Sequence, residues 1–346
     1  MLHEDTRFFL NDTALTAVQL VDLKNVEPWL VAVQRIVKFC LFNEVELDFQ
    51  SSGSTGKPKR IIHSKERLEA SAKATLDCFN LQAKNNALLV LPAHLTGGAM
   101  MIIRACIGGL HLHLQKPTVD PEISSNIDFV PLTPAQFIRT KESGSLDEFN
   151  GTILLGGSAV PTRFDVDSEL KVYAGFGMTE TASHVAIRKL GSPLYEAVGP
   201  TTFSVDEEGA LSIQAPHLDI PSLKTMDLVE LVSSTSFKHL GRANLVINAG
   251  GVKIHPEPLE HWLENQGIQA WLVGLEDEVF GEVPILVCVN PNAIESWSAV
   301  KNAWPTIAVK RALLVSDIPF AAGGKVDRVA LKELVKSHQD HLCPLV

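Results

Sequence analysis

The sequence predicts an α/β fold: a large layered α/β N-terminal domain followed by a small α+β C-terminal domain. Three observations predict this fold. The length of 346 residues suits two domains, and 45% hydrophobic residues are enough for a sizeable core. Short apolar runs alternate with helix-compatible segments through the first part of the chain. After residue 242 the pattern changes to a compact unit of roughly 100 residues, a normal domain size.

Elements of the large domain are expected where short apolar runs or helical patterns are bounded by turn residues. Strands are expected at 87–92, 110–114, 127–132, 152–157, 170–176 and 227–234. Residues 97–110 predict a buried helix that is too short to span a bilayer. Thr133 before Pro134 predicts the start of another helix. Residues 203–214 are typical of a β-hairpin.

The small domain is predicted to occupy 243–346, which leaves 1–242 as the large domain. Its strands are expected at 270–275, 284–289 and 311–316, with helices near 296–304 and from about residue 328. The stretch around Asn244 is polar and flanked by glycine, so it is expected to act as a hinge.

Charge and cysteine content exclude several classes of protein. The net charge of −10 provides no basic field for nucleic acid. Five cysteines without a CxxC pair argue against a structural zinc site or a disulfide framework, and they fit a reducing cytoplasm. The charged N-terminal residues lack the apolar core of a signal peptide, and no membrane span is expected. The sequence does not indicate an oligomeric state.

The stretch SSGSTGKPKR at 51–60 has the composition of a phosphate-binding loop. Its glycines let backbone N–H groups turn inward, its hydroxyls donate hydrogen bonds, and its lysines supply positive charge. The spacing of its glycines differs from that of a P-loop. Taken alone, the stretch fits a solvated turn between strands about equally well. The candidate ligands are Ser51, Ser52, Gly53, Ser54, Thr55, Gly56, Lys57 and Lys59.

Four further blocks decide between these interpretations. They are YAGFGMTETA at 173–182, KTMDLVEL at 224–231, GRANLVINAGGVKIHPEPLE at 241–260 and PFAAGGKVDR at 319–328. Together with SSGSTGKPKR, and in this order, they resemble the adenylate-forming superfamily of acyl- and aryl-CoA ligases. The resemblance implies ATP, Mg²⁺ and coenzyme A, with an acyl-adenylate formed first and a thioester second. It also implies a large domain that is trimmed at its N-terminus and a mobile small domain.

The resemblance assigns most of the nucleotide contacts. Glu180 is expected to hold Mg²⁺, and Asp227 to accept hydrogen bonds from the ribose hydroxyls. Arg242 is expected to reach the ribose or a phosphate, although it could also be a surface residue at the domain boundary. Thr179 and Glu180 could also begin a helix, although the block favours the functional interpretation. The remaining candidates for nucleotide binding are Gly156, Gly157, Ser158, Ala159, Gly175, Gly177, Met178 and Thr179.

Two further residues are expected to act in the chemical steps. By resemblance, Lys325 neutralises the charge that develops between the acid and the α-phosphate. His94 is expected to gate the pocket or to orient the thiol or carboxylate, unless it is a histidine at the edge of the core. Rotation of the small domain is expected to withdraw Lys325 and to present Gly250 and Gly251 as a channel for coenzyme A.

Within the superfamily, the short chain and its segments 92–109 and 154–161 are most similar to ligases that activate 2-succinylbenzoate for menaquinone synthesis. Such a substrate carries a second carboxylate, for which Arg104 and Arg139 are candidate partners beside ordered water. Another aryl- or acyl-CoA ligase or a carrier-loading enzyme is the alternative function, and a non-catalytic nucleotide sensor is a remote one. Two departures from the family pattern are Met226 in place of glycine and Asn244 at the pivot.

Overall fold

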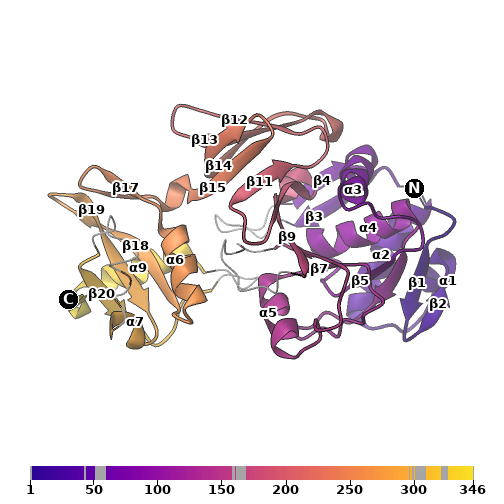
Figure 1. Ribbon diagram of the computed structural model, residues 1–346, viewed down its shortest axis with the longest axis horizontal. Helices are drawn as coiled ribbons and strands as arrows, with labels where there is room; N and C mark the ends of the chain where they lie inside the picture. Colours follow the sequence, from indigo (N-terminus) through magenta and orange to yellow (C-terminus); the bar gives the residue numbers. More distant parts are fainter. Residues whose placement is uncertain are drawn as a thin grey trace.

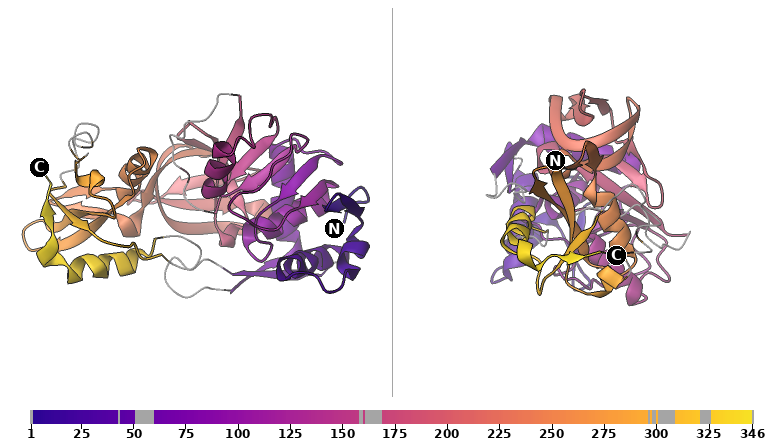
Figure 2. Two further views of the ribbon diagram at one scale, coloured as in Figure 1. Left: turned by 90° about the horizontal axis from the view of Figure 1, so that it is seen from below. Right: turned by 90° about the vertical axis from the view of Figure 1, so that its left-hand side faces the viewer.

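The computed structural model describes residues 2–42, 44–50, 60–157, 160, 169–295, 297, 300, 309–320 and 326–345. Within these residues the chain forms a large mixed sheet and a smaller C-terminal sheet at opposite ends of an elongated molecule (Figure 1). Figure 2 shows the same separation from two other directions. Among the described residues, no helix is long and apolar enough to cross a membrane. The predicted α/β fold is confirmed.

The parallel half of the large sheet has the strand order β9-β8-β7-β5-β6-β1, with β2 added antiparallel at the edge. Its strands are β1 (Arg7–Leu10), β2 (Thr13–Leu15), β5 (Asn86–Leu89), β6 (His111–Leu114), β7 (Phe129–Leu132), β8 (Thr152–Leu155) and β9 (Lys171–Gly177). The five apolar runs between residues 87 and 176 form strands, as predicted. Strands buried on both faces read as continuous apolar runs, which is why the sequence identifies them.

Helices cover this part of the sheet: α1 (Ala17–Asp22), α2 (Pro28–Phe42), α3 (Lys65–Cys78), α4 (Thr96–Gly108) and α5 (Pro134–Glu142). Helix α4 is buried from Gly98 to Cys106 and ends at Gly109, whose φ of 67° suits a left-handed C-cap. In α5, Thr133 accepts from the backbone N–H of Gln136, and the Gln136 side chain accepts from the backbone N–H of Thr133. This capping box confirms the predicted helix start.

The antiparallel half of the sheet leads toward the small domain. It comprises β10 (His184–Lys189), β11 (Leu194–Ala197), β12 (Thr202–Val205), β13 (Ala210–Ala215), β14 (Ile220–Ser233) and β15 (Ser236–Arg242). The predicted hairpin is β12–β13, and the strand expected at 227–234 is the second half of the longer β14. Short 3₁₀ turns lie at Thr179–Thr181, Pro216–Leu218, Ala243–Leu245 and Gln339–His341.

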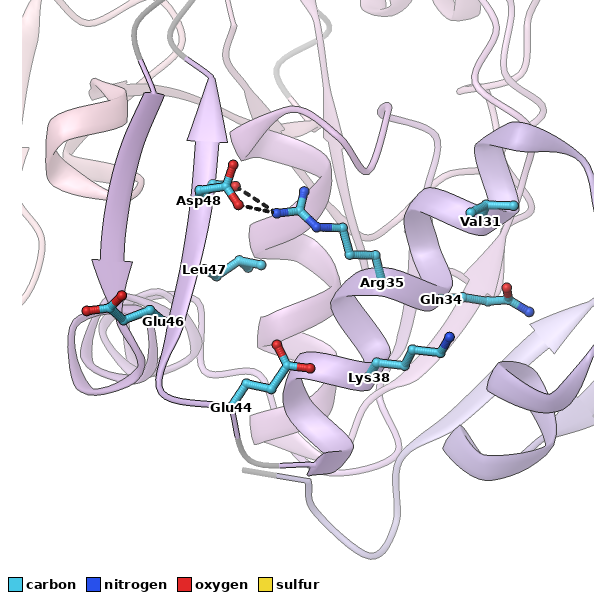
Figure 3. A pocket seen from close by; sticks show the side chains of 8 residues that line it. All are labelled: Val31, Gln34, Arg35, Lys38, Glu44, Glu46, Leu47 and Asp48. Atoms are coloured by element: carbon cyan, nitrogen blue, oxygen red, sulfur yellow. Dashed lines mark hydrogen bonds and ion pairs between the residues drawn. The ribbon is translucent and has the colours of Figure 1, made fainter.

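A separate two-stranded sheet, β3 (Glu46–Gln50) and β4 (Arg60–Ser64), leads into and out of residues 51–59. Asp48 on β3 bonds Arg35 of α2 at 2.6 Å and Arg60 of β4 at 3.1 Å. A groove of about 290 Å³ lies between α2 and β3. Figure 3 shows its lining side chains, with Arg35 pointing toward Asp48. These ion pairs hold the hairpin against α2.

The elements of the smaller C-terminal sheet follow the 3₁₀ turn after β15. The elements after this turn are β16 (Ile247–Ala249), β17 (Val252–Ile254), α6 (Pro256–Asn265), β18 (Ala270–Asp277), β19 (Gly281–Cys288), α7 (Asn292–Glu295), β20 (Arg311–Leu314), α9 (Arg328–Ser337) and β21 (Cys343–Pro344). Glu260 of α6 pairs with Arg328 of α9, and Glu260 also accepts from the backbone N–H of Leu272 at 2.7 Å. The strands predicted at 270–275, 284–289 and 311–316 and the final helix are confirmed, whereas much of the helix expected at 296–304 lies outside the described residues.

Candidate active site

A tight turn after β9 exposes Glu180. A Cβ on Gly177 would lie 2.2 Å from the carbonyl oxygen of Ser183, so only glycine lets the chain double back here. The Thr181 hydroxyl accepts from the backbone N–H of Met178 at 3.0 Å and lies 2.6 Å from the Ser183 carbonyl. The carboxylate of Glu180 is exposed at this turn. The turn belongs to a 3₁₀ segment, so Thr179 does not cap an α-helix.

The same turn is tied to the strand that leaves residues 51–59. Nε2 of His63, on β4, lies 2.7 Å from the carbonyl oxygen of Thr179. Burial lowers the pKa of His63, so the ring is neutral and Nε2–H donates to that carbonyl. The position of Thr179 is therefore fixed relative to β4.

Glu180 fits Mg²⁺ better than a metal held by a full set of protein ligands. No cluster of three or more His, Cys, Asp or Glu side chains suited to a metal occurs in the described part of the chain. Mg²⁺ bound with a nucleotide usually takes one or two carboxylates and completes its shell with phosphate oxygens and water. A single exposed carboxylate beside Thr179 provides such a ligand.

Asp227 lies at the centre of a polar cluster on β14 and β15. It is 4% exposed, and its Oδ1 is 3.0 Å from Nε2 of His239 and 3.3 Å from Nε of Arg242. Burial alone would raise the pKa of Asp227, but the hydrogen bond from His239 and the charge of Arg242 outweigh it and lower the pKa. Met226 is exposed on the same strand, which accommodates this departure from the family pattern without a special backbone angle.

Arg242 also contacts the small domain. Its backbone N–H donates to Oε2 of Glu257 on α6 at 2.6 Å, while its side chain reaches Asp227. Burial raises the pKa of Glu257. Asn244 is exposed in the 3₁₀ turn between the two sheets, and its φ is not positive.

Gly250 and Gly251 form the two-residue turn between β16 and β17. Their φ angles are 59° and 84°, the left-handed region in which glycine is favoured over other residues. The backbone N–H of Gly250 donates to the carbonyl of Phe280 at 2.8 Å, which joins this turn to the neighbouring β18–β19 turn.

A histidine and an arginine suited to binding an acid lie in the turn before α4 and within the helix. His94 is exposed in the turn before the helix. Arg104 lies two turns into the helix and is only 2% exposed. Its Nη2 donates to Oγ of Ser183 at 2.5 Å, and its buried Nε has no partner among the described residues. Burial lowers the pKa of Arg104 to about 10.

Arg139 occupies a very different environment. Its side chain is 62% exposed on α5 and pairs with Glu142 and Asp120. No carboxylate forms an ion pair with Arg104 among the described residues. A buried, unpaired guanidinium is costly, so of the two arginines Arg104 is better suited to an anionic ligand.

Several sequence candidates lie outside the described residues: the loop 51–59, Ser158, Ala159 and Lys325. Their neighbours Gly156 and Gly157 directly follow β8. Among the described residues, no atom lies within 4 Å of a Cβ on Gly156, and Gly157 has a φ of 83°.

Comparisons with known proteins bear on the class of this site. Residues 50–208 match the family model of AMP-binding enzymes. The chain is 26% identical to the 2-succinylbenzoate–CoA ligase of Listeria monocytogenes over 321 residues, covering 82% of this chain and 68% of the relative. It is 25% identical to the Escherichia coli protein of the same name over 317 residues, covering 84% and 69%.

Solved structures of AMP-forming ligases are similar to this chain. The acyl-CoA synthetase (AMP-forming)/AMP-acid ligase II-like protein of Dyadobacter fermentans is 27% identical, with a TM-score of 0.61 over 93% of this chain and 99% of that chain. The o-succinylbenzoate CoA synthetase of Bacillus subtilis, in complex with the acyl-adenylate OSB-AMP, has a TM-score of 0.67 over 82% and 68%. At 19% identity, that second likeness shows the fold alone.

Residues 50–208, a little less than half of the chain, match the AMP-binding enzymes. Together with the similarity to 2-succinylbenzoate–CoA ligases, this match indicates an AMP-forming acid–CoA ligase. The prediction of this class of enzyme is confirmed.

Proposed function

We propose that this chain converts 2-succinylbenzoate to 2-succinylbenzoyl-CoA as a step of menaquinone synthesis in the cytoplasm. ATP and the acid form an acyl-adenylate with release of pyrophosphate, and coenzyme A then displaces AMP. Activation is needed because a carboxylate is a poor electrophile, whereas AMP is a good leaving group from the mixed anhydride.

The proposal of this substrate depends on the environment of Arg104. Without a ligand, its guanidinium is buried beside Ser183 with no carboxylate partner among the described residues. A dicarboxylic acid can react through one carboxylate and place the other near this cation, which satisfies the charge. A fatty acid or a simple aryl acid would leave the guanidinium unpaired. The names of the curated relatives point to the same dicarboxylic acid.

The other residues divide the nucleotide and the chemical steps between them. Residues 51–59 and Thr179 contact the phosphates, Glu180 holds Mg²⁺, and Asp227 and Arg242 receive the ribose. Gly156, Gly157, Ser158 and Ala159 approach the adenine, together with Gly175, Gly177 and Met178 of the β9 segment. His94 orients the acid or thiol at the start of α4.

The two steps are separated by movement of the small domain. We assign 1–242 and 243–346 to the two domains, with the hinge near Asn244. In the first step Lys325 neutralises charge at the α-phosphate, and in the second the Gly250–Gly251 turn replaces it and lines the path of coenzyme A. The large sheet ends at Arg242 and the small sheet begins at Ile247, which supports this division.

The test is acid-dependent formation of AMP and thioester by the purified chain with ATP and Mg²⁺. We expect pyrophosphate release with 2-succinylbenzoate alone and the CoA thioester after coenzyme A is added. Benzoate, octanoate and succinate serve as competing acids. If one of these is the preferred acid, the proposed substrate is wrong. If no organic acid yields AMP, the ligase function itself is wrong.

A further inference from the structure

Arg104 leads into a chain of partly buried polar contacts through Ser183, His184 and Thr75, to which the proposed reaction assigns no role. Ser183 Oγ, which accepts from Arg104, lies 3.2 Å from Nδ1 of His184. On the other side of the ring, Nε2 of His184 lies 3.3 Å from Oγ1 of Thr75 on α3. The Thr75 hydroxyl in turn donates to the carbonyl of Ser71 at 3.2 Å.

The direction of each hydrogen bond follows from which side-chain atoms carry a proton to donate. Arg104 can only donate, so Ser183 accepts from it and keeps its own proton to donate to Nδ1. The proton of Thr75 goes to the carbonyl of Ser71, so Thr75 accepts from His184 Nε2–H. This arrangement gives the side-chain protons of Ser183, His184 and Thr75 an acceptor each. The opposite tautomer of His184 would leave the Ser183 proton without one among the described residues.

The surroundings of His184 favour a neutral, fixed ring. Burial and the charge of Arg104 lower the pKa of His184 to about 3. Phe79 meets the ring edge-on with centroids 6.4 Å apart. A Cβ on Gly175 would lie 3.3 Å from Cβ of His184, so the glycine leaves room for the histidine against β9.

We propose that His184 is a positioning residue for acid selectivity: through Ser183, its neutral imidazole orients the Arg104 guanidinium toward the second carboxylate of the substrate. This inference rests on the proposed function. Because Nδ1 of His184 accepts the proton of the Ser183 hydroxyl, the lone pairs of Ser183 Oγ remain free to accept from Arg104. Thr75, which is 0% exposed, anchors the far side of the ring.

The first test is direct observation of the ring. In protein labelled with ¹⁵N-histidine, the resonances that disappear in His184→Phe identify this residue. We expect the Nε2–H tautomer, with Nδ1 unprotonated, at neutral pH. An Nδ1–H tautomer or a charged ring would overturn the inference whichever acid the enzyme activates.

The second test compares two acids that share the reacting carboxylate. The readout is kcat/KM for 2-succinylbenzoate divided by kcat/KM for 4-oxo-4-phenylbutanoate, which lacks the ring carboxylate. His184→Phe keeps a ring of similar size but accepts no hydrogen bond, and we expect the ratio to fall about tenfold, the worth of about one hydrogen bond. His184→Asn places an amide oxygen near the position of Nδ1, and we expect the ratio to stay within about twofold of the wild type.

Three results would overturn the inference: an unchanged ratio in folded His184→Phe, an equal loss for both acids, or a failure of the asparagine variant to differ from phenylalanine. Thermal unfolding of each variant establishes that it is folded. Failure of the proposed function looks different, because the wild-type chain then forms no AMP with 2-succinylbenzoate. In that case the selectivity proposal falls with the function, and the tautomer measurement still decides the hydrogen-bond chain.

Discussion

Replacing Arg104 with methionine should stabilise the ligand-free protein while impairing its reaction. Methionine has a similar length and can fill the space of the arginine stem without a charge. The guanidinium is 2% exposed, makes a hydrogen bond to Ser183 and has an unpartnered Nε among the described contacts. Replacing buried charges by well-packed apolar groups is often stabilising by about 1–4 kcal/mol. Loss of the donor to Ser183 offsets about 1 kcal/mol of this gain.

The net gain in stability should be about 0–3 kcal/mol, which corresponds to a rise of up to about 12 °C in the unfolding temperature of the large domain. Activity should move in the opposite direction. A charge-assisted hydrogen bond to the second carboxylate is worth about 1.5–3 kcal/mol. We therefore expect kcat/KM for 2-succinylbenzoate to fall by about 10- to 150-fold.

Scanning calorimetry without ligands measures the first effect, and initial rates of pyrophosphate release measure the second. Arg139→Met is the matched control, because that side chain is 62% exposed and its loss should change stability by less than about 0.5 kcal/mol. If Arg104→Met is less stable than the wild type and reacts equally well with 2-succinylbenzoate and with 4-oxo-4-phenylbutanoate, Arg104 is a structural residue and the reasoning is refuted.

Three other predictions concern the rest of the molecule. Lys325→Ala should abolish adenylation but leave thioester formation from preformed acyl-adenylate largely intact; equal loss in both half-reactions, measured separately, would contradict the division of labour. Arg328→Met should destabilise the small domain by about 3–5 kcal/mol in urea titrations, because it leaves the buried Glu260 carboxylate without its cation, whereas Lys332→Met should cost less than about 1 kcal/mol. Because the pKa of Asp227 is lowered in the folded state, its stabilising effect is complete above the unfolded pKa of about 3.9 and is lost as pH falls through the folded value. The stability difference between wild type and Asp227→Asn should therefore be constant from pH 7 to 5 and shrink below about pH 4; a difference that grows on acidification would contradict this assignment.

The elements predicted correctly are those whose sequence signal is local. The parallel strands are buried on both faces and read as apolar runs, and Thr133 with Gln136 makes a capping box within one turn of α5. Strands β10 and β11 were not predicted from the sequence, because their ends are set by pairing across the antiparallel sheet. Their residues alternate between buried and partly exposed positions over only a few residues.

The candidate site divides in the same way. The resemblance of the sequence blocks to the adenylate-forming superfamily proposed Glu180, Asp227 and Arg242, and the structure adds the contacts that surround them. Sequence reasoning missed Ser183 and His184, since their partners Arg104 and Thr75 lie 79 and 109 residues away along the chain. The residue types in TETASH were visible, but only the fold brings α3 and α4 to the same side of β10. A long-range hydrogen-bond chain has no local signature that a single sequence could reveal.

Arg242 links ribose binding to movement of the small domain, two parts of the proposed cycle that were assigned to different sequence blocks. Its side chain contacts Asp227, the proposed ribose ligand, while its backbone N–H is held by Glu257 of the small domain. The preceding Gly241 has a φ of 133°, and a Cβ on it would lie 2.6 Å from Oε2 of Glu257, so another residue there would strain the backbone and displace this carboxylate. Rotation of the small domain about Asn244 must therefore break or carry along the bond to Arg242. In the proposed cycle, loss of the hydrogen bond between Arg242 and Glu257 frees Arg242 to move, and the Arg242 side chain contacts Asp227. Movement of the small domain is thereby coupled to nucleotide binding.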